Sequence, residues 1–232
     1  MSKEQETEVS EEQKLKNRLS NLWFWFFMAI FVLALLVFRL CWSVSFSGVV
    51  VDGTSMCNTL NDGDMLLMRY VDGSKKAERG DVIVVYVENY PEIQAENEGK
   101  KEEDKLKYLI KRLIAVEYDH VRCTDGVLEI QYGGVGDWVE VDEKAYANYG
   151  GRPEIYDFDE YVVDEGEIFF LGDNRNNSKD SRYNQIQGSH LSDLYKEEDI
   201  YGVVPDWAIK NRKVLEWVFF LPDKIEGIIK RK

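Results

Sequence analysis

Hydrophobic positions are spread unevenly along this chain, with one long uncharged run near the N-terminus and short alternating runs after it. Residues 22–38 (LWFWFFMAIFVLALLVF) carry no charge, and the apolar character resumes after Arg39 as far as Trp42. A helix of this length can cross a hydrocarbon core of about 30 Å, with Arg39 reaching toward the interface. The pattern therefore predicts a transmembrane anchor over residues 22–42.

A cleaved secretory leader is the alternative reading of such a run. A leader has a shorter apolar region and ends in a small-residue site, whereas residues 41–44 (CWSV) include bulky side chains. We therefore favour a retained anchor. Lys14, Lys16 and Arg18 precede the run and Arg39 stands alone after it. The positive-inside rule then predicts a single-pass protein with its N-terminus in the cytoplasm.

The period of the pattern changes from helix to strand beyond the anchor. The polar residues 1–21 predict a cytoplasmic, mobile tail with a frayed helical end. From residue 43 to 232, short β-branched and aromatic runs alternate with glycine turns, so this part predicts a mostly β, extracytoplasmic domain. The runs are 65–70, 81–87, 108–116, 127–131, 167–171 and 200–204, and the turns are Asp62-Gly63, Asp72-Gly73, Asp125-Gly126 and Gly133-Gly134.

Three stretches do not fit this strand pattern. Residues 88–107 are dense in Glu and Lys and predict an inserted, solvated loop rather than a binding tail. Residues 142–164, rich in Tyr, Gly and acidic side chains, predict a second inserted loop. Residues 214–221 (VLEWVFFL) are too short to span a membrane and predict a core segment. The alternative is that Trp217 and its aromatic neighbours enter the outer leaflet.

Composition excludes several classes of function. The chain has 29 Lys+Arg against 43 Asp+Glu, a net charge of −14, which argues against a nucleic-acid partner. Cys41, Cys57 and Cys123 form an odd set without paired spacing, so we predict neither a disulfide framework nor a thiolate metal site. With His120 and His190 as the only histidines, a histidine-built zinc site is not expected. The sequence predicts no metal and no cofactor.

A candidate nucleophile follows the extended run at 49–51. Gly53-Thr54-Ser55-Met56 places a serine at the end of a strand, next to a glycine that lets a substrate backbone approach. Serine in a turn is ordinarily only a turn residue, so this segment alone does not decide the matter.

Lys111 is the candidate base, because it lies within an apolar run at 108–116. Alternation along a strand puts Lys111 on one face with Leu109, Leu113 and Ala115, and Arg112 on the other. Aliphatic neighbours remove water from the amine, which lowers its pKa from about 10.4. Only the neutral amine can accept a proton from a serine hydroxyl. The alternative is an amphipathic lysine that reaches water at a strand edge.

Residues 172–182 (GDNRNNSKDSR) form a polar loop directly after an apolar strand. Ser178 could hold the Lys111 amine in position, and Asp180 with Arg182 could form an ion pair that braces the loop. An ordinary loop whose polar groups satisfy one another is the alternative. The sequon at Asn176 is too common a pattern to indicate glycosylation.

Together these segments resemble the bacterial type I signal peptidases, in the same order along the chain. An anchor is followed by a nucleophile box, a strand box, a lysine box, a G-D-N-x-x-x-S-x-D-S-R box and a closing strand. In this chain they are residues 53–60, 79–84, 111–114, 172–182 and 200–204.

The resemblance implies a signal-peptidase-type β-rich domain and assigns roles by position. Ser55 is expected to be the nucleophile and Lys111 the general base, with Ser178 orienting the lysine. Asp180 and Arg182 are expected to support the loop. Gly53 stands where some members of the family carry an oxyanion-binding hydroxyl, so backbone N–H groups, including that of Ser55, are expected to bind the oxyanion.

Two departures from the family pattern are present. Asn58 stands where the family usually has proline, and residues 115–119 (AVEYD) replace a Gly-x-Pro-Gly-Asp run. Both affect turn geometry and the substrate pocket, and both leave the two reacting side chains in place.

We predict a membrane-bound serine endopeptidase that removes signal peptides from exported preproteins by a Ser/Lys dyad. Its expected partners are signal peptides, the lipid bilayer of the cell membrane and, by proximity, the Sec translocon. Substrates with small side chains at −1 and −3 are expected to lie extended against a strand. A self-cleaving Ser/Lys repressor-type peptidase, a Ser/His relative and a membrane-tethered pseudo-peptidase are the rival interpretations.

Overall fold

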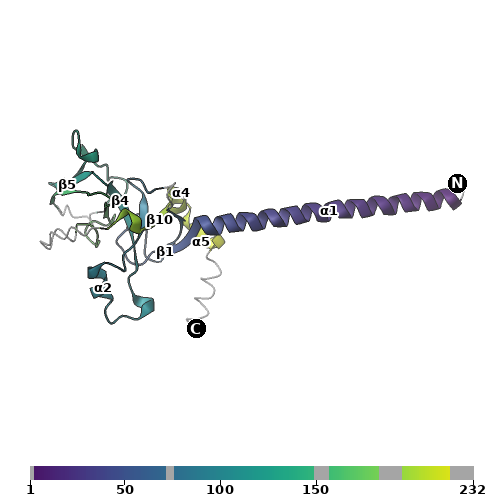
Figure 1. The fold of residues 1–232 in the computed structure, drawn as a ribbon, viewed down its shortest axis with the longest axis horizontal. Helices are drawn as coiled ribbons and strands as arrows, with labels where there is room; N and C mark the ends of the chain where they lie inside the picture. The colour runs from purple at the N-terminus through teal and green to yellow at the C-terminus, as the bar shows by residue number, and fades with distance from the viewer. Residues whose placement is uncertain (1–2, 72–75, 149–156, 183–194, 220–232) are drawn as a thin grey trace. The chain divides into compact units, whose positions relative to one another are not determined.

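The computed structural model describes residues 3–71, 76–148, 157–182 and 195–219, and it divides into two compact units at residues 45 and 46. The first unit is the single helix α1 (Lys3–Ser45) (Figure 1). Its part from Lys16 to Ser45 is long and apolar enough to cross a membrane. Large apolar side chains such as Trp25 and Phe31 are exposed along it, as a lipid-facing helix requires.

The mobile tail predicted for residues 1–21 differs from the structure, because α1 is helical from Lys3 onward. Starting a helix is costly, whereas extending an existing helix is not. The apolar run supplies the nucleus, and the Glu, Lys and Gln residues before it are good helix formers.

A six-stranded antiparallel sheet forms the larger part of the second unit, in the order β1-β2-β10-β3-β4-β9. Its strands are β1 (Phe46–Val50), β2 (Met65–Tyr70), β3 (Val82–Tyr86), β4 (Tyr108–Val116), β9 (Ile168–Leu171) and β10 (Ile200–Val204). One apolar cluster covers a face of this sheet, built around Ile83, Leu113 and Phe170.

A four-stranded antiparallel sheet follows in the order β7-β6-β5-β8. Its strands are β5 (His120–Thr124), β6 (Val127–Gln131), β7 (Val139–Glu140) and β8 (Phe158–Val162), with η2 (Tyr132–Gly134) after β6. Its core contains Val121, Ile130 and Phe169. The mostly β class predicted from the sequence is confirmed. The β-rich part contains two hydrophobic core clusters.

The predicted strands at 65–70, 108–116, 127–131 and 200–204 have the observed bounds, while those at 81–87 and 167–171 are slightly shorter in the structure. The expected alternation on β4 fails at one position. A bulge between Leu113 and Ala115 shifts the register against β9. Because a bulge adds one residue, Ala115 packs in the core of the smaller sheet, apart from Leu109 and Leu113.

Residues 88–107 form an ordered segment between β3 and β4, which we call the excursion, rather than the predicted solvated loop. They contain α2 (Pro91–Asn97) and η1 (Glu102–Asp104). Ile93 is fully buried in the core of the larger sheet. The Asn97 side chain accepts from the N–H of Leu106 and donates to its carbonyl, both at 2.8 Å. One apolar side chain and one buried amide therefore anchor a segment whose composition is mostly charged.

The second predicted loop, 142–164, also contains structure on both sides of residues 149–156, which lie outside the described residues. Strand β8 occupies its end. At its start, Asn148 pairs with Asn174 in an isolated parallel bridge. The predicted turn at Asp72-Gly73 and the residue His190 also lie outside the described residues.

The chain ends, as far as it is described, in η3 (Glu197–Asp199) before β10, then α4 (Asp206–Lys210) and α5 (Arg212–Phe219). The core segment predicted at 214–221 is wrong for its described part, because Val214 and Trp217 are 61% and 69% exposed. The run is helical, and a spacing of three residues puts these two side chains on one face, directed to solvent.

Candidate active site

Ser55 is held in the turn that follows β1. Gly53, with φ of +91°, opens this turn, and its N–H donates to Asp62 Oδ1 at 2.8 Å. A positive φ of this kind favours glycine. The Ser55 carbonyl accepts from the N–H of Asn174 at 3.0 Å, and the Asn174 side chain donates to the Thr54 carbonyl at 3.0 Å. The polar loop 172–182 therefore fixes the main chain on which Ser55 stands.

Lys111 lies on β4 and is 3% exposed. Its Nζ is 2.7 Å from Ser55 Oγ and 3.1 Å from the Ile110 carbonyl oxygen. Burial lowers the pKa of the Lys111 amine to about 8, against opposing effects of the Asp180 and Asp173 carboxylates. An amine with this pKa is partly neutral near pH 7 to 8, and in that state it can accept a hydroxyl proton.

Two buried ion pairs lie beside this amine. Arg112 and Asp173 make two contacts, at 2.8 and 2.7 Å, and Asp180 and Arg182 make two, both at 2.8 Å. Each arginine balances the negative charge of one of the carboxylates that raise the pKa of Lys111. Paired charges are far less costly to bury than single ones. Two carboxylates can therefore lie near Lys111 while its pKa remains lowered.

Asp173 and Asp180 also tie the loop to its surroundings. Thr59 Oγ1 donates to Asp173 Oδ2 at 2.5 Å, which links the loop to the segment that follows Ser55. The N–H of Gly172 donates to Asp180 Oδ2 at 3.0 Å. Removing either carboxylate would therefore release backbone as well as charge.

Ser178 is placed close to Ser55 by the packing at Gly172. A Cβ at position 172 would lie 2.1 Å from Ser178 Oγ and 2.6 Å from the Ser55 carbonyl oxygen, so only glycine fits there. The Ser178 Oγ is buried and has no hydrogen-bond partner among the described residues. The contact to Lys111 expected from the sequence is thus not made in this structure, although the hydroxyl remains at the site.

Sequence reasoning missed Tyr146, which belongs to the stretch interpreted as an inserted loop. The Arg112 guanidinium lies 4.1 Å from the centre of the Tyr146 ring, and that of Arg175 lies 5.8 Å from it. Arg175 also pairs with the buried Glu143 at 2.5 Å. A cation over an aromatic face is stabilised electrostatically. Tyrosines and acidic residues recur throughout residues 142–164, so composition alone cannot distinguish Tyr146 from the residues of a polar loop.

A groove with a volume of about 940 Å³ runs from Ser55 and Lys111 along one face of the larger sheet. Residues 47–52 line one side and residues 108–110 the other, with Met68 and Val84 between them. β1 is the terminal strand of the sheet, and pairing of β4 with β9 begins only at Arg112. Both sides of the groove therefore present strand edges to which an extended peptide can add.

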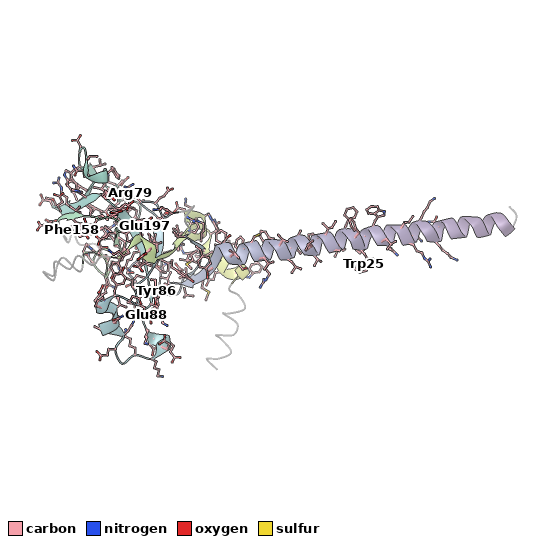
Figure 2. All side chains as sticks on the ribbon, in the orientation of Figure 1. Trp25, Arg79, Tyr86, Glu88, Phe158 and Glu197 are labelled. Atoms are coloured by element: carbon pink, nitrogen blue, oxygen red, sulfur yellow. The ribbon has the colours of Figure 1, made fainter. Side chains whose placement is uncertain are left out.

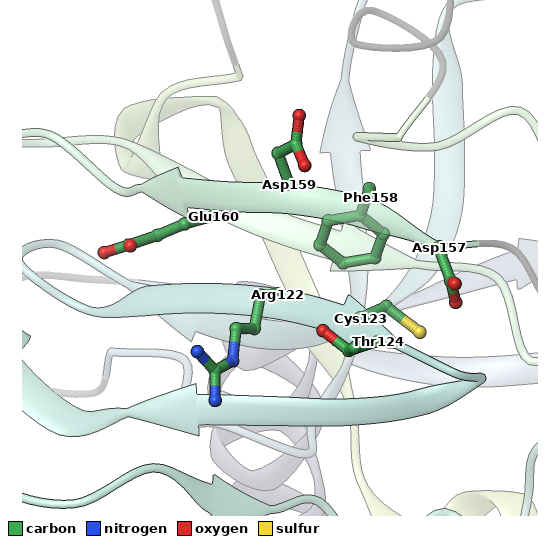
Figure 3. Close-up of a pocket in the computed structure, with 7 residues that line it drawn as sticks. All are labelled: Arg122, Cys123, Thr124, Asp157, Phe158, Asp159 and Glu160. Atoms are coloured by element: carbon green, nitrogen blue, oxygen red, sulfur yellow. The ribbon is translucent and has the colours of Figure 1, made fainter.

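A second hollow, of about 510 Å³, lies in the smaller sheet (Figure 3). Residues 122–124 of β5 and residues 157–160 at β8 line it. Its one thiol, Cys123, has a pKa raised to about 12, mainly by burial, so that thiol stays protonated and is a poor nucleophile. The groove at Ser55 instead contains a serine hydroxyl 2.7 Å from a buried amine whose pKa is lowered.

A buried lysine amine beside a serine hydroxyl is an arrangement that a serine endopeptidase can use, and similarity to known proteins shows the class. The family described as signal peptidase, peptidase S26, matches residues 23–218, so the chain belongs to that family. It is thus a peptidase that removes signal peptides from preproteins, and the family, fold class and activity predicted from the sequence are confirmed.

The chain is also similar to individual proteins and to a solved structure. The chain is 30% identical to Signal peptidase I of Bacillus licheniformis over 175 residues, which cover 74% of this chain and 83% of the relative. It is 29% identical to Signal peptidase I T of Bacillus subtilis (strain 168), covering 78% and 85% of the two chains. A crystal structure of a signal peptidase I from Enterococcus faecalis V583 is 25% identical, with a TM-score of 0.36, and covers 56% of this chain and 98% of that one.

Proposed function

We propose that Ser55 is the nucleophile and Lys111 the general base of this signal peptidase. The observation that supports the assignment best is the 2.7 Å contact between Lys111 Nζ and Ser55 Oγ, made by an amine that is almost completely buried. In the first step the neutral amine takes the Ser55 proton while Oγ attacks the carbonyl carbon at position −1 of the substrate. The amine then passes that proton to the leaving nitrogen.

Water then hydrolyses the acyl-enzyme, with the same amine as the general base. Lys111 takes a proton from the water as its oxygen attacks the ester carbon, and Ser55 Oγ leaves with the proton that the lysine returns. The charge that develops on the carbonyl oxygen requires hydrogen-bond donors. Gly53 has no side chain to supply one, so the backbone N–H of Ser55 is assigned to this role.

Ser178, Asp180 and Arg182 complete the proposed site in supporting roles. Because the Ser178 hydroxyl is buried, unpaired among the described residues and next to the Ser55 main chain, a small rotation of the lysine in the substrate complex can give it a partner. It then orients the amine. The Asp180–Arg182 pair holds the loop that carries Ser178.

The groove explains how a signal peptide is presented. An extended segment that adds to the strand edges of residues 49–52 and 108–110 alternates its side chains, so those at −1 and −3 face the same wall. Buried Met56, Met68 and Val84 line that region. Side chains larger than alanine at these positions are therefore expected to be excluded.

The membrane arrangement is part of the same proposal. The basic residues before the apolar run support a cytoplasmic N-terminus, with residues 43–232 outside the cell membrane. Enzyme and preprotein are then tethered to one bilayer, close to where the Sec translocon releases its substrates, and tethering raises their effective concentration. Impermeant maleimide should label a Lys101→Cys variant, after removal of the native cysteines, in intact cells. Labelling only after lysis would show that residue 101 lies in the cytoplasm and would contradict the proposed orientation.

The dyad is tested by cleavage of a preprotein in detergent. Ser55→Ala and Lys111→Ala should each abolish cleavage, and Lys101→Ala, which alters an exposed lysine of the excursion, should retain it. Near-normal cleavage by either dyad variant, in protein with an unchanged circular dichroism spectrum, would end the assignment.

A further inference from the structure

Four tyrosines from four neighbouring strands lie together at one end of the larger sheet. They are Tyr70 on β2, Tyr201 on β10, Tyr86 on β3 and Tyr108 on β4, which we call the tyrosine row. The ring centres of successive members are 5.4, 5.1 and 5.4 Å apart, in the order Tyr70, Tyr201, Tyr108, Tyr86. Such spacings are those of interacting aromatic pairs.

The tyrosine row is held in place and remains accessible. The Tyr86 hydroxyl donates to Glu88 at 2.7 Å (Figure 2), and the Tyr70 and Tyr201 rings pack edge to face. Tyr108 and Tyr201 are nevertheless 40% and 41% exposed. Rings that are fixed before binding lose little conformational entropy when a ligand covers them.

A bulge in β10 places Tyr201 in the row. The pairing of β10 with β3 shifts between Ile200 and Gly202, so Tyr201 is the extra residue. Gly202 is required beside it, because a Cβ there would lie 2.8 Å from the Arg69 carbonyl oxygen. Bulges next to active sites often redirect a side chain, and this one directs a ring into the groove.

The tyrosine row continues the groove that contains Ser55. Tyr108 and Tyr201 line that groove, and they also line a hollow of about 430 Å³ with Tyr70 and Tyr86. Tyr108 precedes Lys111 by three residues, a distance of about 10 Å along a strand. An extended substrate with position −1 at Ser55 therefore reaches the row at about position −4.

From this geometry we propose that the tyrosine row binds residues −4 to −6 of the signal peptide and selects apolar side chains there. The inference rests on the proposed function, which places the signal-peptide side of the substrate in this groove. The mature ends of different preproteins share no common chemistry, so an apolar, aromatic surface has a constant ligand only on the signal-peptide side.

A bilayer surface is the other apolar occupant that tyrosines suit, and charge disfavours it. Glu198 and Asp199 line the same hollow, and Glu88 adjoins Tyr86. The part of the chain after the anchor keeps the whole net charge of −14, since the five basic and five acidic residues among the first 42 cancel. Anionic headgroups would be repelled here, whereas an uncharged peptide segment is not.

The test uses two preproteins that are identical except for three leucines or three serines at −4 to −6. The full chain in detergent should cleave the leucine form with the higher kcat/KM. Tyr201→Ala should reduce that preference about tenfold, through the KM of the leucine form alone. Tyr201→Phe keeps the ring and should keep the preference. Tyr132→Ala, at an exposed tyrosine of η2, should not change it.

The other outcomes are also decisive. An unchanged ratio in Tyr201→Ala, and in Tyr70→Ala as a second variant, would overturn the inference. An equal loss for both substrates, seen only after reconstitution into liposomes, would assign the row to the bilayer instead. Cleavage that persists in Ser55→Ala contradicts the proposed function itself, so failure of the two proposals can be told apart.

Discussion

The amine of Lys111 lies 2.7 Å from the hydroxyl of Ser55, although 56 residues separate them in the chain. Strand β4 supplies the first group and the turn after β1 the second. The contact joins a buried amine, whose pKa is lowered, to a hydroxyl that is inert until its proton has an acceptor. Protonation of one side chain should therefore control the activity of the site.

The first prediction concerns pH. Because burial lowers the pKa of Lys111 to about 8 from an ordinary value of 10.5, the active, neutral form increases as pH rises through 8. We expect kcat/KM for preprotein cleavage to rise with pH to a plateau, with its midpoint near 8. Stopped assays in detergent between pH 6 and 10 measure it. A midpoint above 10 would mean that the amine is hydrated.

The second prediction concerns the Asp180–Arg182 pair. The Asp180 carboxylate is the strongest of the charges that raise the pKa of Lys111. Arg182→Gln leaves this carboxylate without its bidentate partner, so the midpoint of the pH profile should move to higher pH. The double variant Asp180→Asn/Arg182→Gln removes both charges and should move the midpoint back below that of the single variant.

A control separates this electrostatic effect from general damage. Removing one partner of a buried pair costs roughly 3–5 kcal/mol of stability, so both variants must first be shown to be folded by thermal melting. Activity that falls equally at every pH, with an unchanged midpoint, would show that the pair only supports the loop.

The third prediction concerns Ser178. Its buried Oγ has no hydrogen-bond partner among the described residues, and an unsatisfied buried hydroxyl is destabilising. Ser178→Ala should therefore raise the free energy of unfolding by about 1 kcal/mol. If the hydroxyl orients Lys111 during the reaction, the same variant should lose roughly tenfold to a hundredfold in kcat. A variant that is more stable and fully active would exclude the orienting role.

Parts of this fold followed from the sequence because their pattern is local. The apolar run of α1 and the strands at 65–70 and 108–116 are long or strongly periodic, and the glycine turn at Gly63 has the expected positive φ of 79°. The pairing of Ser55 with Lys111 was also proposed from the sequence, since an apolar strand that contains one lysine is an unusual pattern, and the two side chains lie 2.7 Å apart.

Other features depend on contacts that no local pattern contains. Ile93 anchors a segment whose other residues are mostly charged, and Tyr146 packs on arginines that are distant in sequence. The bulges at Ala115 and Tyr201 are decided by pairing with β9 and β3. A one-residue shift of register changes which face a side chain occupies, so strand alternation predicted the face of Lys111 but not that of Ala115.

The fourth prediction tests whether the excursion at residues 88–107 is packed. Ile93→Ala should lower the free energy of unfolding by roughly 2–5 kcal/mol, because it leaves a cavity in the core of the larger sheet. Gln94→Ala, at the adjacent exposed position of α2, should change it by less than about 0.5 kcal/mol. Equal effects of the two substitutions on the thermal midpoint would indicate a solvated loop.

The last prediction is that burial of Lys111 lowers the stability of the folded protein. Below pH 8 the Lys111 amine is charged in both folded and unfolded protein, and the full cost of burying the charge is present. Between pH 8 and 10.5 only the unfolded state keeps the proton, so wild-type stability should rise with pH through this window. The shift corresponds to a cost on the order of 3 kcal/mol at pH 7. Lys111→Met has a similar shape without the charge.

Lys111→Met should accordingly be inactive yet more stable than the wild type at pH 7, by about 1–3 kcal/mol after loss of the contacts to Ser55 and Ile110. The difference should shrink at pH 10. Lys107→Met, at a more exposed lysine paired with Glu102, should give no such gain. Thermal unfolding in detergent at the two pH values measures both variants. A Lys111→Met protein less stable than the wild type at pH 7 would show that the amine is well solvated. Burial could then not explain a lowered pKa of Lys111.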